Sequence, residues 1–210
     1  MNTYAGSRPP DRDPPTIENR KVPVRKANVA YRSREYLLEQ EVAALIEAAA
    51  CAGRHGTRDA ALILIAYRHG LRVSELVSLR WDQVDLRQGL LHVTRLKHGI
   101  ASVHPLRGPE LRVLRRLQRD YRDTAYVFVS ERKAPLTSDT VRKIVGRAGR
   151  QAGIEFSVHP HMLRHATGYK LANDGQDTRA IQHYLGHRNI QHTTRYTELA
   201  SDRFRAFWSD

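Results

Sequence analysis

The sequence has little of what secreted or membrane-spanning proteins need. Cys51 is its only cysteine, so the chain cannot form an internal disulfide, and this fits a reducing cytosol. The longest apolar run is far shorter than the roughly 20 residues of a membrane span, and the polar, proline-rich first 15 residues do not resemble a signal peptide. We therefore expect a cytoplasmic protein without a membrane partner. Cys51 lies in an alanine-rich segment, where we expect a small, buried side chain.

Acidic residues are also scarce. The chain has 22 Asp and Glu against 35 Lys and Arg, which gives a net charge of +13 and an isoelectric point near 10.4. This balance favours a polyanionic partner such as DNA, held by phosphate contacts that weaken with salt, although ribosome-associated and anionic-membrane-binding proteins share it. With 210 residues, 40% of them hydrophobic, the chain is long enough for one substantial domain.

The spacing of apolar residues predicts a mainly α fold with a small antiparallel β-sheet. Residues 1–34 are rich in proline, lack periodicity and carry a net charge of +5, so we expect a flexible arm that either lies along DNA or stays solvated. One folded domain is expected over residues 35–198. Its predicted helices cover residues 34–52, 57–70, 73–79, 109–121 and 137–152, followed by a helix that begins at Pro160 and one from Asp177 to Gly186. A hairpin is predicted over 90–96 and 100–106, with a possible third strand over 84–86 and a short buried segment over 127–129.

The last third of the sequence concentrates cations and one phenol. His161 and Arg164 are three residues apart, so they share one face of a helix. His187 directly follows Gly186, where a helix is expected to end. A further helix is expected to start at Thr193 or Thr194 and to carry Tyr196. Histidines, arginines and a tyrosine without a carboxylate cluster suit a site that holds a phosphodiester while a phenolic oxygen attacks it.

A metal site is the alternative use of these histidines. His183 and His187 have the i, i+4 spacing of a metal pair, and further histidines are near in sequence. However, the HEXXH pattern is absent, the region has no cysteine, and its carboxylates are sparse. The same scarcity disfavours two-metal phosphoryl transfer, which needs carboxylates to hold the ions. We therefore expect neither a metal nor another cofactor.

Five motifs, in order along the chain, carry a family resemblance. They are HGLRVSEL at 69–76, RLKHG at 95–99, HMLRHATGY at 161–169, YLGHRNI at 184–190 and TTRYT at 193–197. With these motifs the chain resembles the tyrosine recombinases, or phage-integrase family, and is most similar to the fimbrial phase-variation invertases. The resemblance implies a catalytic domain over 35–198 that cleaves DNA through a 3′-phosphotyrosyl intermediate, within a homotetramer on paired sites in the bacterial nucleoid. It further implies inversion of a DNA segment and an accessory DNA-bending protein.

The resemblance also implies roles for individual residues. Tyr196 would be the nucleophile, with a pKa lowered by adjacent cations. Arg72 and Arg164 would clamp the phosphate, since a guanidinium is permanently charged and bonds two oxygens at once. Lys97, at the predicted hairpin tip, would protonate the leaving 5′ oxygen. The imidazoles of His161 and His187 would donate to the phosphate or relay protons near neutral pH, and Glu75 would either orient a neighbouring arginine or histidine or form a structural ion pair.

Several alternatives remain open on the sequence. The same chemistry could integrate or excise a mobile element, the basic surface could belong to a non-catalytic DNA-binding regulator, and the histidines could serve a metal hydrolase. The tail over 199–210 has an aromatic stripe, Phe204, Phe207 and Trp208, on a helix predicted over 198–208. It could pack on its own domain or dock into a neighbouring protomer.

Overall fold

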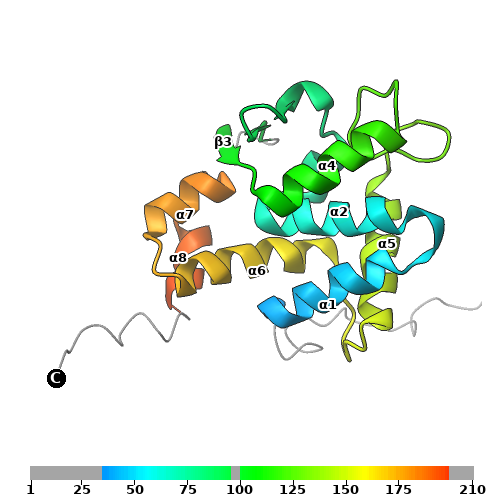
Figure 1. The fold of residues 1–210 in the computed structure, drawn as a ribbon. Helices are drawn as coiled ribbons and strands as arrows, with labels where there is room; N and C mark the ends of the chain where they lie inside the picture. The colour runs from blue at the N-terminus through cyan, green and yellow to red at the C-terminus, as the bar shows by residue number, and fades with distance from the viewer. Residues whose placement is uncertain (1–34, 96–99, 199–210) are drawn as a thin grey trace, which may run out of the picture. The chain divides into compact units, whose positions relative to one another are not determined.

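The computed structural model of the protein describes residues 35–95 and 100–198. Its helices are α1 (Glu39–Ala50), α2 (Gly56–Arg68), α3 (Val73–Val77), α4 (Gly108–Asp120), α5 (Ser138–Gln151), α6 (Pro160–Asn173), α7 (Thr178–Leu185) and α8 (Gln191–Glu198), with short 3-10 turns at Gly53–His55 and Trp81–Gln83. The strands are β1 (Val84–Asp85), β2 (Leu90–Val93) and β3 (Ser102–Pro105). The predicted mainly α fold with a small antiparallel sheet is confirmed (Figure 1).

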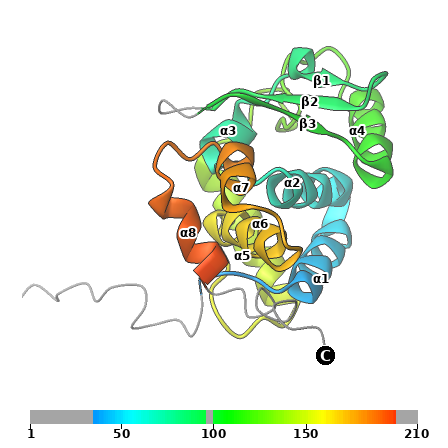
Figure 2. The ribbon, with the colours of Figure 1, turned by 90° about the vertical axis from the view of Figure 1, so that its left-hand side faces the viewer.

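Helix α2 is the centre of the hydrophobic core. It packs against α1, α4 and α6, and Leu62, Ile63 and Ile65 have no exposed surface at all. In Figure 2 it lies between the layer of α4 and the sheet on one side and α6 on the other. A helix covered on several faces holds its ends in place, and the segment after α2, which carries Gly70 and Arg72, is therefore fixed by the core.

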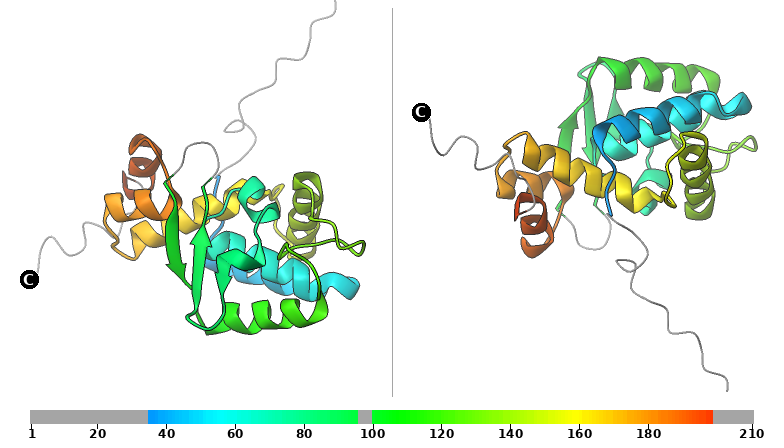
Figure 3. Two further views of the ribbon diagram at one scale, coloured as in Figure 1. Left: turned by 90° about the horizontal axis from the view of Figure 1, so that it is seen from above. Right: turned by 90° about the horizontal axis from the view of Figure 1, so that it is seen from below.

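The three strands form one antiparallel sheet in the order β1-β2-β3, visible from above in Figure 3. Leu91 of β2 pairs with Val84 of β1 and with His104 of β3. Side chains alternate across a strand, and Leu91 and Val93 are buried while His92 is exposed. The predicted tip of this hairpin, with Lys97, lies outside the described residues.

Helices α6, α7 and α8 pack against one another at one side of the core. Asp177 caps α7, as predicted, because its carboxylate accepts hydrogen bonds from the backbone N–H groups of Arg179 and Ala180 at 2.8 and 2.9 Å. Gly186 ends α7 in the left-handed conformation, with φ of 65°. This conformation strains residues that have a Cβ, so the glycine sets the direction in which the chain leaves α7.

The predicted start of α8 is wrong. The helix begins at Gln191, where the Asn189 carboxamide accepts a hydrogen bond from the Gln191 N–H at 2.9 Å. Thr193 lies inside the helix instead of capping it, since its hydroxyl is buried against His187. One consequence is that Tyr196 lies in the second turn of α8.

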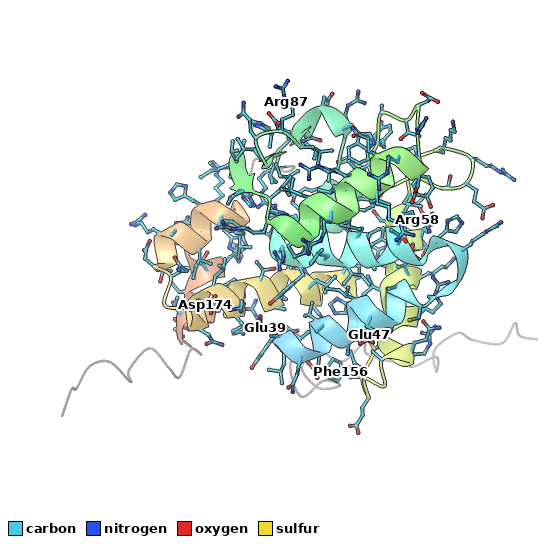
Figure 4. The ribbon with its side chains drawn as sticks, in the orientation of Figure 1. Glu39, Glu47, Arg58, Arg87, Phe156 and Asp174 are labelled. Carbon is cyan, nitrogen blue, oxygen red and sulfur yellow. The ribbon has the colours of Figure 1, made fainter. Side chains whose placement is uncertain are left out.

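Two predictions concerned burial, one of Cys51 and one of the segment over 127–129. Cys51 is exposed, contrary to expectation, because α1 ends at Ala50 and the cysteine follows the last buried residue, Ala49. The segment over 127–129 is buried, as predicted. It lies near a cluster of ion pairs on α2 and α5, in which Arg58, labelled in Figure 4, bonds Asp59 at 2.7 Å.

The predictions for the two ends of the chain were tested only in part. The helix predicted from residue 34 begins at Glu39. The arm over 1–34 and the predicted helix over 198–208 lie outside the described residues, apart from Glu198. Within the described part, none of the helices is long and apolar enough to cross a membrane.

Candidate active site

A pocket of about 250 Å³ opens where α6, α8 and the segment before α3 meet. Its lining includes five of the six predicted catalytic residues, and the sixth, Lys97, lies outside the described residues. The lining residues are Arg72, His161, Arg164, His165, His187, His192, Arg195 and Tyr196. A second, wider hollow of about 730 Å³ shares Arg72, His187 and His192 with it and adds Arg179 and Arg188. Cations thus surround both hollows, and the phenol lies in the smaller one.

Arg164 forms the buried part of this pocket. Its Nη1 donates to the Gly70 carbonyl and its Nη2 to the Leu185 carbonyl, the latter at 2.6 Å. Burial, with the nearby charges of Arg72 and Arg95, lowers the pKa of Arg164 to about 9, so the guanidinium stays charged at neutral pH. Because one side chain joins the end of α2 to the end of α7, its position is fixed by the fold.

Arg72 is held by a carboxylate. It is the N-cap of α3, and Glu75 accepts hydrogen bonds from the Arg72 backbone N–H at 2.9 Å and from Nη1 at 2.8 Å. Oε2 of Glu75, the oxygen that accepts from the Arg72 backbone N–H, also accepts from Nη1 of Arg95 at 2.9 Å. Burial acts to raise the pKa of Glu75, but these bonds and the charge of Arg95 outweigh it and hold that pKa below its ordinary value.

Arg95 is a buried residue of this site that sequence reasoning missed. Besides Glu75, its guanidinium bonds the carbonyls of Tyr184 and His69, and its side chain packs so closely on Gly186 that a Cβ there would lie 2.7 Å from the Arg95 Cγ. A signal was available in the alternation of β2, which places position 95 on the same inward side as Leu91 and Val93.

Tyr196 is almost fully buried, with 2% of its surface exposed. Its ring lies against Gly168 of α6, where an added Cβ would come within 2.6 to 2.7 Å of three ring carbons. Its hydroxyl bonds Nδ1 of His165 at 2.9 Å. Burial raises the pKa of Tyr196 and outweighs the lowering effect of Arg164 and Arg195. The cations act in the expected direction, but the expected net lowering of this pKa is wrong for the site without DNA, because burial dominates.

The two predicted histidines occupy different places in the pocket. His187 is buried, and its Nδ1 bonds the Thr193 hydroxyl at 2.9 Å. Burial and the charges of Arg164 and Arg72 lower the pKa of His187 to about 3. His161 is exposed at the rim, and loss of solvent on its protein side, with the charge of Arg164, lowers its pKa as well. Burial and the neighbouring arginines therefore favour the neutral form of both rings in the site without DNA.

His165 is the second residue that sequence reasoning missed. It lies four positions after His161, a spacing that places both rings on one face of α6, and the ring centroids are 4.3 Å apart.

The described residues contain no group of three or more His, Cys, Asp or Glu side chains that could hold a metal ion.

Comparison with known proteins decides the family. The pattern of the Phage integrase family matches residues 35–203. The chain belongs to this family. It is 45% identical to the type 1 fimbriae regulatory protein FimE of Escherichia coli K12 over 83% of this chain and 91% of that protein. Its identity to FimB of the same strain is 38%, over 84% and 90%. These findings confirm the resemblance, and they make this family member a tyrosine-type site-specific recombinase, which cleaves and rejoins DNA.

Larger relatives share only this domain. Tyrosine recombinase XerD of Pseudomonas putida is 38% identical over 80% of this chain but only 59% of its own length. The crystal structure of XerA recombinase matches with a TM-score of 0.71 and 31% identity, over 82% of this chain and 63% of that one. A lambda integrase dimer bound to a core site matches with a TM-score of 0.63 at 24% identity, over 83% and 50%, which shows the common fold.

Proposed function

We propose that this recombinase inverts a DNA segment by a phosphotyrosyl mechanism centred on the 250 Å³ pocket. The observation that carries the chemistry is the meeting of the Arg72 and Arg164 guanidiniums with the Tyr196 phenol in one pocket of this size. Inversion is supported by the likeness to FimE and FimB, which extends over about nine tenths of the length of these two proteins. Their names describe them as regulators of fimbriae. Integration or excision by the same chemistry is the alternative. It has less support, because the likeness to the larger relative XerD covers a smaller share of that protein's length.

The scissile phosphate is proposed to sit between Arg72 and Arg164. Hydrogen bonds from charged donors are roughly twice as strong as neutral ones, and donors that are already in place stabilise the charge of the transition state without reorganising. His161 and His187 would donate from their ring N–H groups to the same phosphate. A bound phosphodiester adds a negative charge beside both rings, so it raises their pKa values toward neutrality.

The covalent step exchanges one ester for another. The phenolic oxygen of Tyr196 attacks the phosphorus, a Tyr–O–P bond forms, and the P–O5′ bond breaks. Lys97 is proposed to protonate the leaving 5′ oxygen. The 5′ hydroxyl of the partner strand then attacks the phosphotyrosine, which releases Tyr196. The ester keeps the bond energy, so religation needs no ATP.

The same proposal covers the assembly. Residues 35–198 would be the catalytic domain, residues 1–34 a basic arm on the DNA, and residues 199–210 a tail that docks into a neighbour. Strand exchange between two sites needs four protomers, one for each strand cut, and we propose that an accessory DNA-bending protein brings the sites together within the cytoplasm.

The deciding experiment recovers covalent protein–DNA complexes from cells that express the chain and sequences the attached DNA. We expect adducts at two inverted repeats with wild-type protein and none with Tyr196→Phe, in which the fold is kept and the nucleophilic oxygen is lost. A plasmid that carries both repeats should then show inversion of the segment between them, also in EDTA.

Other outcomes would overturn parts of the proposal. Adducts that persist in Tyr196→Phe would exclude this nucleophile. DNA binding without any adduct from the wild type would indicate a non-catalytic regulator. Adducts at direct repeats that flank a mobile element, as attachment sites do, would indicate integration.

A further inference from the structure

The nucleophile of this site has a hydrogen-bond partner that the roles assigned above do not use. In the part of the chain that the structure describes, the side chain that bonds the Tyr196 hydroxyl is His165, through Nδ1 at 2.9 Å. Both groups are buried, with 2% of Tyr196 and 6% of His165 exposed. A general base must lie within hydrogen-bond reach of the proton it removes, and this geometry already exists before DNA binds.

The other two histidines are less well placed for this task. The Nδ1 of His187 is engaged by the Thr193 hydroxyl, and its ring stacks beside Tyr196 with centroids 6.2 Å apart. His161 packs edge-on against His165 rather than against the phenol. Of the three imidazoles, only His165 has a nitrogen in contact with the attacking oxygen.

We propose that His165 is the general base of DNA cleavage, taking the Tyr196 proton on Nδ1 as the phenol oxygen attacks the phosphorus. The inference deepens the recombinase function proposed above and rests on it. Nδ1 is unprotonated in the tautomer that carries its proton on Nε2, and the phenol O–H then donates to it. Burial, together with the nearby His161, Arg195 and Arg164, lowers the pKa of His165 to about 3, so in the resting site the ring is neutral and able to accept.

The proton balance of the step is closed. As the Tyr–O–P bond forms, the phenol O–H bond breaks and its proton moves to Nδ1 of His165. As the P–O5′ bond breaks, the leaving oxygen takes a proton from a separate acid, for which Lys97 is proposed. When the incoming 5′ hydroxyl attacks the phosphotyrosine, its proton passes to the amine of Lys97, which is neutral after the first step. The Tyr–O–P bond breaks, and the proton on His165 returns to the oxygen of Tyr196.

The charges around His165 explain why the transfer would wait for DNA. Cationic and titratable groups face it from every element of the pocket, and a protonated imidazole among them is unfavourable. They are Arg164 and His161 on α6, His159 before it, Arg72 before α3, His187 and His192 around the start of α8, and Arg195 and Tyr196 on α8. A phosphodiester in the pocket offsets part of this charge, which makes His165 a stronger base only when substrate is present.

A docking role is the competing explanation, in which His165 merely holds the tyrosine in place. The variants His165→Asn and His165→Ala separate the two. The carboxamide oxygen of asparagine lies near the position of Nδ1 and can accept the hydrogen bond, but it cannot take a proton. His183→Asn is the matched control, because His183 is an exposed histidine on α7 outside the pocket.

The assay uses a duplex centred on the cleavage position found by the adduct mapping, with sulfur in place of the bridging 5′ oxygen. A thiolate leaves without a proton, so the acid step no longer limits the rate. We expect His165→Asn to form adduct about 100-fold or more slowly than the wild type, in line with the usual worth of a general base, and His183→Asn to match the wild type. Added imidazole should restore part of the rate of His165→Ala.

The pH dependence supplies an independent readout. Without its base, His165→Asn must wait for the phenol to ionise by itself, so its rate should rise about tenfold per pH unit below the phenol pKa, while the wild-type rate stays level around neutrality. Wild-type rates in His165→Asn would overturn the inference and support docking alone. Loss of adduct that neither imidazole nor high pH restores would also overturn it. Absence of adduct in the wild type would instead overturn the proposed function.

Discussion

The two sides of the pocket are built differently. On the arginine side, each residue is tied to the fold by two hydrogen bonds. The Arg164 guanidinium bonds the Gly70 and Leu185 carbonyls, and Arg72 bonds Glu75 through its backbone N–H and through one guanidinium nitrogen. On the tyrosine side, Tyr196 belongs to an eight-residue helix and makes a hydrogen bond to His165 and a flat contact with Gly168. Helices this short owe their stability to packing.

This difference separates two tasks of the enzyme. Binding of the phosphate needs cations that are already in position, because reorganisation costs transition-state stabilisation. Delivery of a nucleophile needs a segment that can be placed and withdrawn, and a short helix that is held by its packing on α6 and α7 suits this task. The variants below are chosen to affect one side and spare the other.

The largest loss of stability is expected from Arg164→Met. It leaves two buried carbonyls without their donor, and each such group costs about 1–3 kcal/mol, so the free energy of unfolding in urea should fall by about 2–5 kcal/mol. Arg72→Met is the matched control. Its side chain is 29% exposed and Glu75 keeps the bond from Arg95, so a loss of about 1 kcal/mol or less is expected. Equal losses would contradict the distinction between the two arginines.

A somewhat smaller loss, about 2–4 kcal/mol, is expected from Arg95→Met. The variant leaves the buried carboxylate of Glu75 with Arg72 alone and removes the donor to Tyr184, and an uncompensated buried charge is costly. Adding Glu75→Gln should recover part of the loss, because the charge that lacks a partner is then gone. Strictly additive losses in a double-mutant cycle would show that the pair is not coupled.

Gly168→Ala tests the tyrosine side. A methyl group at this position meets the Tyr196 ring at 2.6 Å and should push α8 off α6. We expect cleavage to fall about 100-fold through misplacement of the nucleophile, with a change in unfolding free energy of only about 1–2 kcal/mol. Gly146→Ala on α5 is the control, since the nearest atom to its Cβ is 3.7 Å away. Faster hydrogen exchange confined to α8 would localise the effect, and unchanged cleavage would refute it.

The smallest effect is expected in the pH dependence of stability. His187 has a pKa lowered to about 3 by burial, so the unfolded chain binds a proton near pH 6.5 that the folded chain does not. Stability from this group is therefore present above about pH 6.5 and is lost as the pH falls toward 3. In His187→Asn, the decline in unfolding free energy between about pH 6.5 and 5 should be smaller by roughly 1 kcal/mol. Most carboxylates titrate below this pH range, so they contribute little to the decline there. An unchanged slope would mean that folding does not lower the pKa of His187.

The fold was predictable because its signals are local. The Asp177 cap and the Gly186 stop of α7 depend on residues within one or two helical turns, and the buried core of α2 follows from its apolar spacing. The meeting of Arg72 with Arg164 and Tyr196 was predictable only through the resemblance, because no local pattern brings Arg72 to residues that are more than 90 positions along the chain.

What the sequence did not predict depends on burial in three dimensions. Arg95 and His165 are polar residues whose type suggests a solvated surface, and their contacts are with groups far along the chain. The direction of the Tyr196 pKa shift was missed for the same reason, since the desolvation that outweighs the arginines exists only once α8 packs on α6. Cys51 was misplaced because the helix predicted to reach residue 52 ends at Ala50, just before it.

The bond between His187 and Thr193 links a proposed phosphate ligand to the helix that carries the proposed nucleophile, Tyr196. Thr193 lies one turn before Tyr196, so a movement that withdraws the tyrosine either breaks this bond or carries the imidazole along with it. In the second case, a protomer that retracts the proposed nucleophile would also withdraw the proposed His187 contact with the DNA backbone. In an assembly where protomers take turns at cutting, such a linkage would keep an idle subunit from holding a strand as firmly as a working one.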